Sequence, residues 1–181
     1  MKRLLAVLFL LAMSGATALF GQVNSESQKL NYFAGTWKIV IHLNAPALYS
    51  KTFIETEYND WLPGRALLLS RQEADNEVSG GVTVLTYDPQ NKIYRYHQIK
   101  NNGDLQDLRG SFEKGTWIWM SAGVSNHDQS PKTRLVIKEV NDTSYTLKLE
   151  SATEGHDWST VMEGEASKVL ARAHQDIAFL R

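Results

Sequence analysis

Three structural signals meet in the segment Leu30-Asn31-Tyr32-Phe33-Ala34-Gly35-Thr36-Trp37-Lys38-Ile39-Val40-Ile41-His42. The residues before Gly35 have helical spacing, and a glycine is a typical stop for the one or two helical turns that we expect over residues 27–33. Beyond Gly35, apolar and polar residues alternate as far as Leu43, which predicts a half-buried strand. The inward face of this strand is expected to carry Trp37, Ile39 and Ile41.

The remainder of the chain continues as strands separated by turn signals. Residues 62–64, 88–91 and 101–104 carry the Pro, Gly, Asn and Asp residues that favour turns. About ten short strands with no helical pattern between them are typical of an antiparallel barrel or sandwich. We therefore predict an all-β fold, an up-and-down barrel over residues 34–167 with a short N-terminal helical turn. The expected strands cover residues 36–43, 51–61, 65–72, 82–87, 93–100, 105–112, 117–120, 133–140, 143–150 and 157–163.

The N-terminus carries the pattern of a signal peptide. Lys2 and Arg3 precede an apolar run over residues 4–13, and Ala16-x-Ala18 fits a cleavage site. We expect residues 1–18 to be removed, with a cut near Gly21 or Gln22, or a retained membrane anchor, as alternatives. Residues 19–33 are then a linker and the short helical turn. The tail at 168–181 fits a packing helix, a last strand or a frayed end.

Composition narrows the compartment and the partners. The 181 residues include no cysteine, which favours a bacterial periplasmic or secreted protein over an exported eukaryotic one. The formal net charge is −1, and loss of Lys2 and Arg3 leaves 17 basic against 20 acidic residues, or −3. Such a chain is a poor electrostatic match for nucleic acid or anionic lipid, and we expect no membrane span after signal cleavage. The oligomeric state is left open.

Three motifs give the chain a family resemblance. Gly35-x-Trp37, Leu62-x-Gly64-Arg65 and Tyr87-Asp88-Pro89 occur in the order found in exported bacterial lipocalin-like (calycin) proteins. The resemblance covers residues 30–164. It implies a meander of eight to ten strands around a ligand cavity, with Trp37 across the closed end. Gly35 and Trp37 would then be structural, and the resemblance brings no agreed activity.

The strand at 93–100 carries the most function-like residues. One face presents Tyr94, Tyr96 and Gln98, and the other presents Arg95 and His97. Inward tyrosines would give a cavity rigid walls with hydroxyl donors, whereas an inward Arg and His would give an anion site. Both faces are amphipathic, so the sequence leaves the inward face open, and an exterior strand with solvated Arg and His is a third reading.

Other candidates come from two more of the expected strands. Arg65 follows a turn, where it either binds a ligand carboxylate or covers Trp37 through a cation–π contact, and we favour the second. Trp117 and Trp119 share one strand face, which suits a core or a cavity wall. The remaining predicted wall residues are Leu67 and Leu69.

Patterns for catalysis and metal binding are weak. Glu55 and Glu57 share a strand face, but Lys51 and Asp60 on the same strand favour a solvated face over an acid–base pair. The five histidines are scattered and form no metal-binding motif. We therefore predict no cofactor, no metal and no catalytic residue.

The leading hypothesis is an exported barrel that binds a small apolar or amphipathic molecule. The alternatives are a small barrel enzyme of isomerase or hydrolase type, using a His/Tyr/Arg pocket, and an envelope protein that binds a partner through its outer face. The enzyme hypothesis requires a histidine, an acid and a tyrosine or arginine to converge in one pocket. The partner hypothesis requires an exposed apolar patch.

Overall fold

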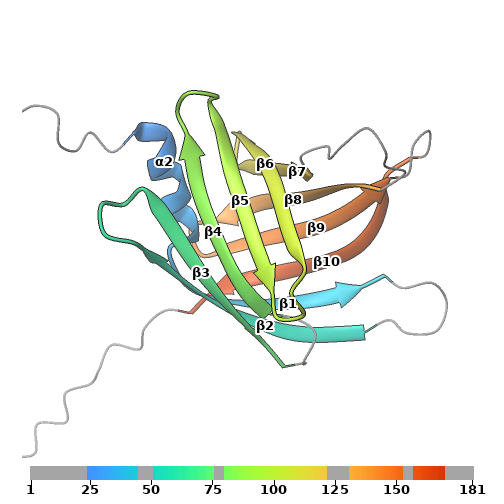
Figure 1. Ribbon diagram of the computed structural model, residues 1–181. Coiled ribbons are helices and arrows are strands. Elements are labelled where there is room, and N and C mark those ends of the chain that lie inside the picture. The colour runs from blue at the N-terminus through green and yellow to red at the C-terminus, as the bar shows by residue number, and fades with distance from the viewer. Residues whose placement is uncertain (1–23, 45–50, 76–79, 122–130, 153–156, 170–181) are drawn as a thin grey trace, which may run out of the picture.

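The computed structural model is a closed ten-stranded antiparallel barrel with a short helix at its N-terminal end (Figure 1). It describes residues 24–44, 51–75, 80–121, 131–152 and 157–169. Each strand pairs with the next one in sequence, and β1 pairs with β10 to close the ring, which confirms the predicted fold class. The strands are β1 (Gly35–Leu43), β2 (Lys51–Trp61), β3 (Leu67–Ala74), β4 (Gly80–Asp88), β5 (Ile93–Lys100), β6 (Leu105–Glu113), β7 (Thr116–Ser121), β8 (Lys132–Asn141), β9 (Ser144–Ala152) and β10 (Ser159–Lys168).

The two ends of the barrel differ in their connections. Short turns at residues 62–66, 89–92, 114–115 and 142–143 join the strands at one end, where the N-terminal helix also packs. The turn after β4 is held by Asp88, whose Oδ1 accepts hydrogen bonds from the backbone N–H groups of Gln90 and Asn91, both at 3.1 Å. This Asx geometry is what the Asp-Pro pattern predicts. The turn at residues 101–104, between β5 and β6, lies at the opposite end of the barrel.

The N-terminal helix α2 (Ser25–Lys29) and the 3₁₀ turn η1 (Leu30–Phe33) close the end with the short turns. Trp37 is fully buried there, and its Nε1 donates to the backbone oxygen of Phe33 at 2.8 Å. The hydroxyl of Tyr32 donates to Ser144 O at 2.7 Å, which ties η1 to β9. The ring of Tyr145 lies 4.9 Å from that of Trp37. Trp37 thus lies in the floor of the barrel, packed between η1 and β9.

Arg65 does not cover Trp37, so that part of the prediction is wrong. The cation over the Trp37 ring is Lys168, with Nζ 5.2 Å from the ring centroid. Arg65 has a left-handed backbone (φ 52°), and its guanidinium lies 5.7 Å from the Trp61 ring and bonds Asn31 Oδ1 at 3.4 Å. The tight turn after β2 directs its side chain along the outside of the closed end.

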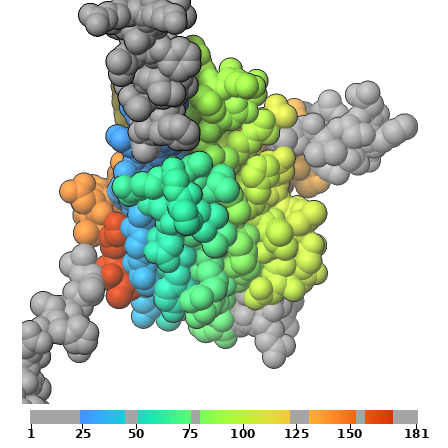
Figure 2. Space-filling view, turned by 60° about the vertical axis from the view of Figure 1, so that its left-hand side comes forward, coloured from blue at the N-terminus to red at the C-terminus, as the bar shows by residue number. Residues whose placement is uncertain are grey.

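The outer wall is continuous from strand to strand. Figure 2 shows β1 to β6 side by side over one face, in chain order from blue to yellow. β10 ends at Lys168, one residue beyond the predicted barrel. The proposed signal peptide and residues 170–181 lie outside the described residues.

Candidate ligand-binding site

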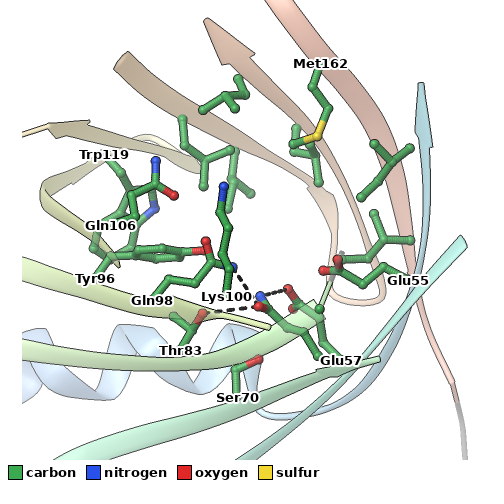
Figure 3. A pocket seen from close by; sticks show the side chains of 18 of the residues that line it. Glu55, Glu57, Ser70, Thr83, Tyr96, Gln98, Lys100, Gln106, Trp119 and Met162 are labelled. Carbon is green, nitrogen blue, oxygen red and sulfur yellow. Dashed lines mark hydrogen bonds between the residues drawn. The ribbon is translucent and has the colours of Figure 1, made fainter. Parts of the chain in front are cut away.

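A cavity of about 440 Å³ occupies the interior of the barrel above the aromatic floor. Its volume is within the usual range for small-molecule sites, roughly 300–1,000 Å³. One wall is apolar and is formed by inward side chains of β1, β2 and β8 to β10. Figure 3 shows Met162 on this side, across the cavity from Ser70 and Thr83. The apolar wall consists of Ile39, Ile41, Leu43, Phe53, Leu135, Ile137, Leu147, Leu149, Val161 and Met162.

The opposite wall is polar. It comes from four consecutive strands, β2 to β5, whose inward positions carry carboxyl, amide and hydroxyl groups in place of aliphatic side chains. Neighbouring positions on paired strands meet here: Gln72 is opposite Glu57, and Ser70 is opposite Asn59. The polar wall consists of Glu55, Glu57, Asn59, Ser70, Gln72, Thr83, Tyr96, Gln98 and Lys100.

Gln72 organises the polar wall. Its Nε2 donates to Glu57 Oε1 at 3.0 Å, and its Oε1 accepts from Gln98 Nε2 at 2.7 Å. The Thr83 hydroxyl adds a longer bond to the same Oε1 at 3.4 Å. Figure 3 draws these bonds as a line running from β2 to β5. Because both ends of its amide are engaged, Gln72 has a fixed orientation and holds the Glu57 carboxyl in place.

Both glutamates of β2 point into the barrel, so the predicted solvated face is wrong. Burial raises the pKa of Glu55 to about 8, and repulsion from Glu57 adds to the effect, while Lys100 opposes it. Burial also raises the pKa of Glu57, against the hydrogen bonds from Gln72 and Asn59. Proximity in a dry setting shifts carboxyl pKa values upward in this way. The site therefore holds at least one protonated carboxyl group at neutral pH.

Three buried polar atoms on the cavity lining have no hydrogen-bond partner. They are Asn59 Oδ1, Ser70 Oγ and Trp119 Nε1, on residues that are 3%, 3% and 1% exposed. All three residues line the cavity. A buried polar group without a partner costs roughly 1–3 kcal/mol, so most such groups in folded proteins are satisfied. In this protein, the three unsatisfied groups lie together in the wall of the cavity.

The tyrosine face of β5 points inward. Tyr96 lines the cavity with its ring 5.6 Å from that of Trp119, which also lines the cavity. Burial raises the pKa of Tyr96, with a further contribution from Glu57. Of the nine residues predicted to bind a ligand, these two lie at the cavity surface.

Tyr94 and Trp117 lie below the cavity, in the floor. Tyr94 donates its hydroxyl to Glu26 Oε2 at 2.9 Å, and Trp117 Nε1 donates to Glu139 Oε1 at 2.8 Å. The two rings are 5.0 Å apart. Both side chains serve the core and the attachment of α2, and neither lines the cavity.

The remaining predicted residues point away from the cavity. Arg95 forms an ion pair with Asp88 at 3.2 Å, and His97 lies 3.3 Å from Asp107, both on the outside of the barrel. Leu67 and Leu69 are on the outer face of β3, because Leu68, Ser70 and Gln72 take the inward positions. The prediction that Leu67 and Leu69 form cavity walls is therefore wrong. On β5, Tyr96 and Gln98 line the cavity, so the alternative in which Arg95 and His97 are the inward polar groups is also wrong.

The sequence does contain a signal for the polar wall that was missed. β1 pairs with β2 so that Trp37, Ile39 and Ile41 are opposite Glu57, Glu55 and Phe53. Directly opposed residues share a face of the sheet. The inward face predicted for β1 therefore also fixes Glu55 and Glu57 as inward, once the register of the first hairpin is known.

Histidines are missing from the described cavity lining. His42 and His97 point outward, and His127, His156 and His174 lie outside the described residues. Within the described ranges, no three His, Cys, Asp or Glu side chains come together as a metal site requires. Across the same ranges, no helix is long and apolar enough to cross a membrane.

Comparison with known proteins identifies the fold. No family model and no curated sequence matches the chain. The crystal structure of Rv2717c from M. tuberculosis matches over 82% of this chain and 100% of its own, with a TM-score of 0.58 and 10% sequence identity. The S-type phycobiliprotein lyase CPES from Guillardia theta matches over 83% and 95%, with a TM-score of 0.51 and 11% identity. The fold of this chain is thus similar to that of proteins with lipocalin-like barrels, whereas the sequence identity to both is low.

Proposed function

We propose that this protein is an exported carrier or receptor that binds one small amphipathic molecule inside its barrel. The observation that carries the proposal is a cavity with one apolar and one polar wall, whose lining residues Asn59, Ser70 and Trp119 hold polar atoms without a hydrogen-bond partner. A cavity filled by its own side chains would have satisfied or avoided these groups.

The two walls define how such a molecule would lie. Its apolar part would pack against Leu135, Leu147 and Met162, and its polar part would face Glu57 and Gln72. Apolar contacts supply affinity and the few polar groups fix orientation, as in most small-molecule sites. The fold likeness to a phycobiliprotein lyase supports a barrel that handles a small molecule.

Export is the second part of the proposal. It rests on the signal-peptide pattern of residues 1–18 and the absence of cysteine, which fit a periplasmic or secreted protein. N-terminal sequencing of the protein from an expressing bacterium tests it. We expect a mature chain that begins after Ala18 or near Gly21, and recovery of an intact Met1 in the cytoplasm would contradict it.

Native mass spectrometry of protein purified without detergent tests the binding function. We expect a non-covalent adduct, or uptake of an amphipathic molecule from a mixture. A Leu149→Trp variant, which places an indole in the cavity, is expected to lose it. Its control is Lys148→Trp, on the exposed face of the same strand. If both variants bind as the parent does, the binding site is not in the barrel.

The enzyme alternative loses its main support. It required a histidine with an acid and a tyrosine or arginine in one pocket, and the described lining contains no histidine. A carboxyl group with a raised pKa and a nearby tyrosine remain in the cavity.

A row of exposed aliphatic side chains favours partner binding as a second candidate function. Val82, Ile99 and Leu105 are directly paired across β4, β5 and β6, and are 40%, 57% and 78% exposed. Such groups mark an interaction surface when they are contiguous. Analytical ultracentrifugation of an Ile99→Ser, Leu105→Ser variant tests this, because self-association through the row would be lost.

A further inference from the structure

The charge of the cavity selects among amphipathic ligands. The described lining residues include three acidic side chains, Glu55, Glu57 and Asp104, and one basic side chain, Lys100. Glu55 and Glu57 lie two residues apart on β2, so both project from the same face into the same space. An anionic ligand would oppose ionisation of this carboxyl pair, and a cationic one would favour it.

Two of the three unpartnered atoms, on Asn59 and Ser70, have the matching polarity, whereas Trp119 Nε1 is a donor. Asn59 Oδ1 is an acceptor, and its orientation is fixed because the amide nitrogen donates to Phe33 O at 2.9 Å and to Glu57 Oε2 at 3.4 Å. Ser70 Oγ lies opposite Asn59 on β3 and also offers lone pairs. A ligand that donates hydrogen bonds would satisfy these atoms and the carboxyl oxygens together.

We propose that the barrel binds an amphipathic organic cation, with a protonated amine seated between Glu55 and Glu57 beside Asn59 Oδ1 and its apolar part along the wall of β8 to β10. This ligand class rests on the proposed binding function. A primary ammonium has three donors and no acceptor, which fits two carboxylates and an amide oxygen.

Binding of such a cation would change the protonation of Glu55. Burial and Glu57 keep this carboxyl protonated at neutral pH in the empty cavity, since its pKa is raised to about 8. A cation beside the carboxyl favours the ionised form, so Glu55 would release its proton on binding. The groups that face the Glu55–Glu57 pair from the surrounding strands are Lys100 and Tyr96 on β5, Tyr145 on β9 and Asp104 at the mouth.

Lys100 is the competing feature. Its ammonium would attract a ligand carboxylate, which would reverse the preference. Lys100 lowers the pKa of Glu55 by less than burial and Glu57 each raise it. Lys100 is therefore the weaker electrostatic influence on Glu55. The Glu57 carboxyl is also held in place by Gln72 and Asn59, whereas Lys100 lines the cavity together with Asn102 and Asp104 of the following turn.

The test is isothermal titration calorimetry of the purified mature chain at pH 7. Decylamine, 1-decanol and decanoate share one alkyl chain and differ in their head group, so they separate charge from apolar burial. We expect decylamine to bind at least about tenfold more tightly than 1-decanol, and decanoate to bind most weakly. Titration in two buffers of different ionisation enthalpy should show release of about one proton per decylamine bound.

The matched variant is Glu55→Gln, which retains the shape of the side chain and removes its charge. We expect it to lose the advantage of decylamine and the proton release while it retains binding of 1-decanol. Glu165→Gln, on the outer face of β10, is expected to behave as the parent does.

Two outcomes would overturn the cation proposal. The first is that decanoate binds as tightly as decylamine or more tightly. The second is that decylamine binds without releasing a proton and binds equally well to Glu55→Gln. In either case the barrel would still bind amphipathic molecules, but it would not select a cation. Failure of all three ligands to bind would overturn the cation proposal together with the binding function itself, because 1-decanol tests the apolar wall alone.

Discussion

Trp119 lies flat against Gly110, its direct partner on the neighbouring strand, so closely that a β-carbon at Gly110 would overlap the indole ring. Both positions face the interior, and the ring forms part of the cavity lining. Because Gly110 has no side chain, it leaves the space that the Trp119 ring occupies. This explains a glycine at a strand position, where it would otherwise weaken the strand.

Gly110→Ala is therefore expected to displace the Trp119 ring into the cavity. Overpacking of this kind costs about 1–3 kcal/mol. Urea unfolding should show the loss of stability, and ligand affinity should fall with it. Ser111→Ala, one residue along on the exposed face, should change the free energy of unfolding by less than about 0.5 kcal/mol. A Gly110→Ala protein with parental stability and affinity would contradict the assigned packing.

The stability of the protein should fall as the pH rises from about 4.5 to about 8. The unfolded chain releases the Glu55 proton near the ordinary pKa of 4.5, whereas the folded protein retains it to about 8. In this range the folded state binds more protons, so raising the pH lowers the free energy of unfolding. Above pH 8 this contribution levels off.

Glu55→Gln removes that dependence. At pH 8 the variant should be more stable than the parent by on the order of 4 kcal/mol, because the pKa is raised from 4.5 to about 8 and each unit corresponds to about 1.4 kcal/mol. The difference should shrink towards pH 5. Urea unfolding over this pH range measures it, and a parental curve that rises with pH would show that Glu55 is not held in a protonated state.

Gln72→Ala should remove the hydrogen bonds that join Glu57, Gln98 and Thr83. The loss leaves buried polar groups without partners, at a cost of about 1–3 kcal/mol. Arg71→Ala is the control on the same strand, because its guanidinium lies outside the barrel, 4.7 Å from the Tyr58 ring. Thermal unfolding should give a lower melting temperature for Gln72→Ala than for Arg71→Ala. Equal melting temperatures would show that the hydrogen bonds of the polar wall contribute little to stability.

Trp37→Ala should be the most damaging single substitution in the floor. The side chain is fully buried against Phe33 and Tyr145, and removal of a large core side chain costs about 3–5 kcal/mol. Trp61→Ala should cost less, because Trp61 is half-buried and bonds Asn31 at the surface. Denaturant unfolding of both variants measures the two losses of stability. A larger loss in Trp61→Ala than in Trp37→Ala would show that Trp37 is not the main packing residue of the floor.

The fold was predictable because local signals agree. Alternation after Gly35, turns at regular spacing and the absence of helical patterns all indicate a barrel, and the structure confirms it. The site was less predictable because its location depends on strand parity. The three successive leucines at 67–69 fit either parity, and pairing with β2 and β4 places Leu68 inward.

The polar wall shows a second limit. Two glutamates, two glutamines and an asparagine on strands read locally as a solvated face. Only closure of the barrel around a cavity makes these positions interior, and closure is a property of all ten strands together. The tyrosine face of β5 was correctly considered as one alternative, and Gln98 on that face belongs to the polar wall.

Trp119 also gives the protein an optical reporter of its own. Of the five tryptophans, all within the described residues, it alone lines the cavity, and its Nε1 has no partner there. A ligand that hydrogen-bonds this nitrogen or displaces water from the ring would alter its emission, while Trp37 and Trp117 in the floor would contribute a constant background. Unlabelled compound collections can therefore be screened by intrinsic fluorescence, with Trp119→Phe as the silent reference.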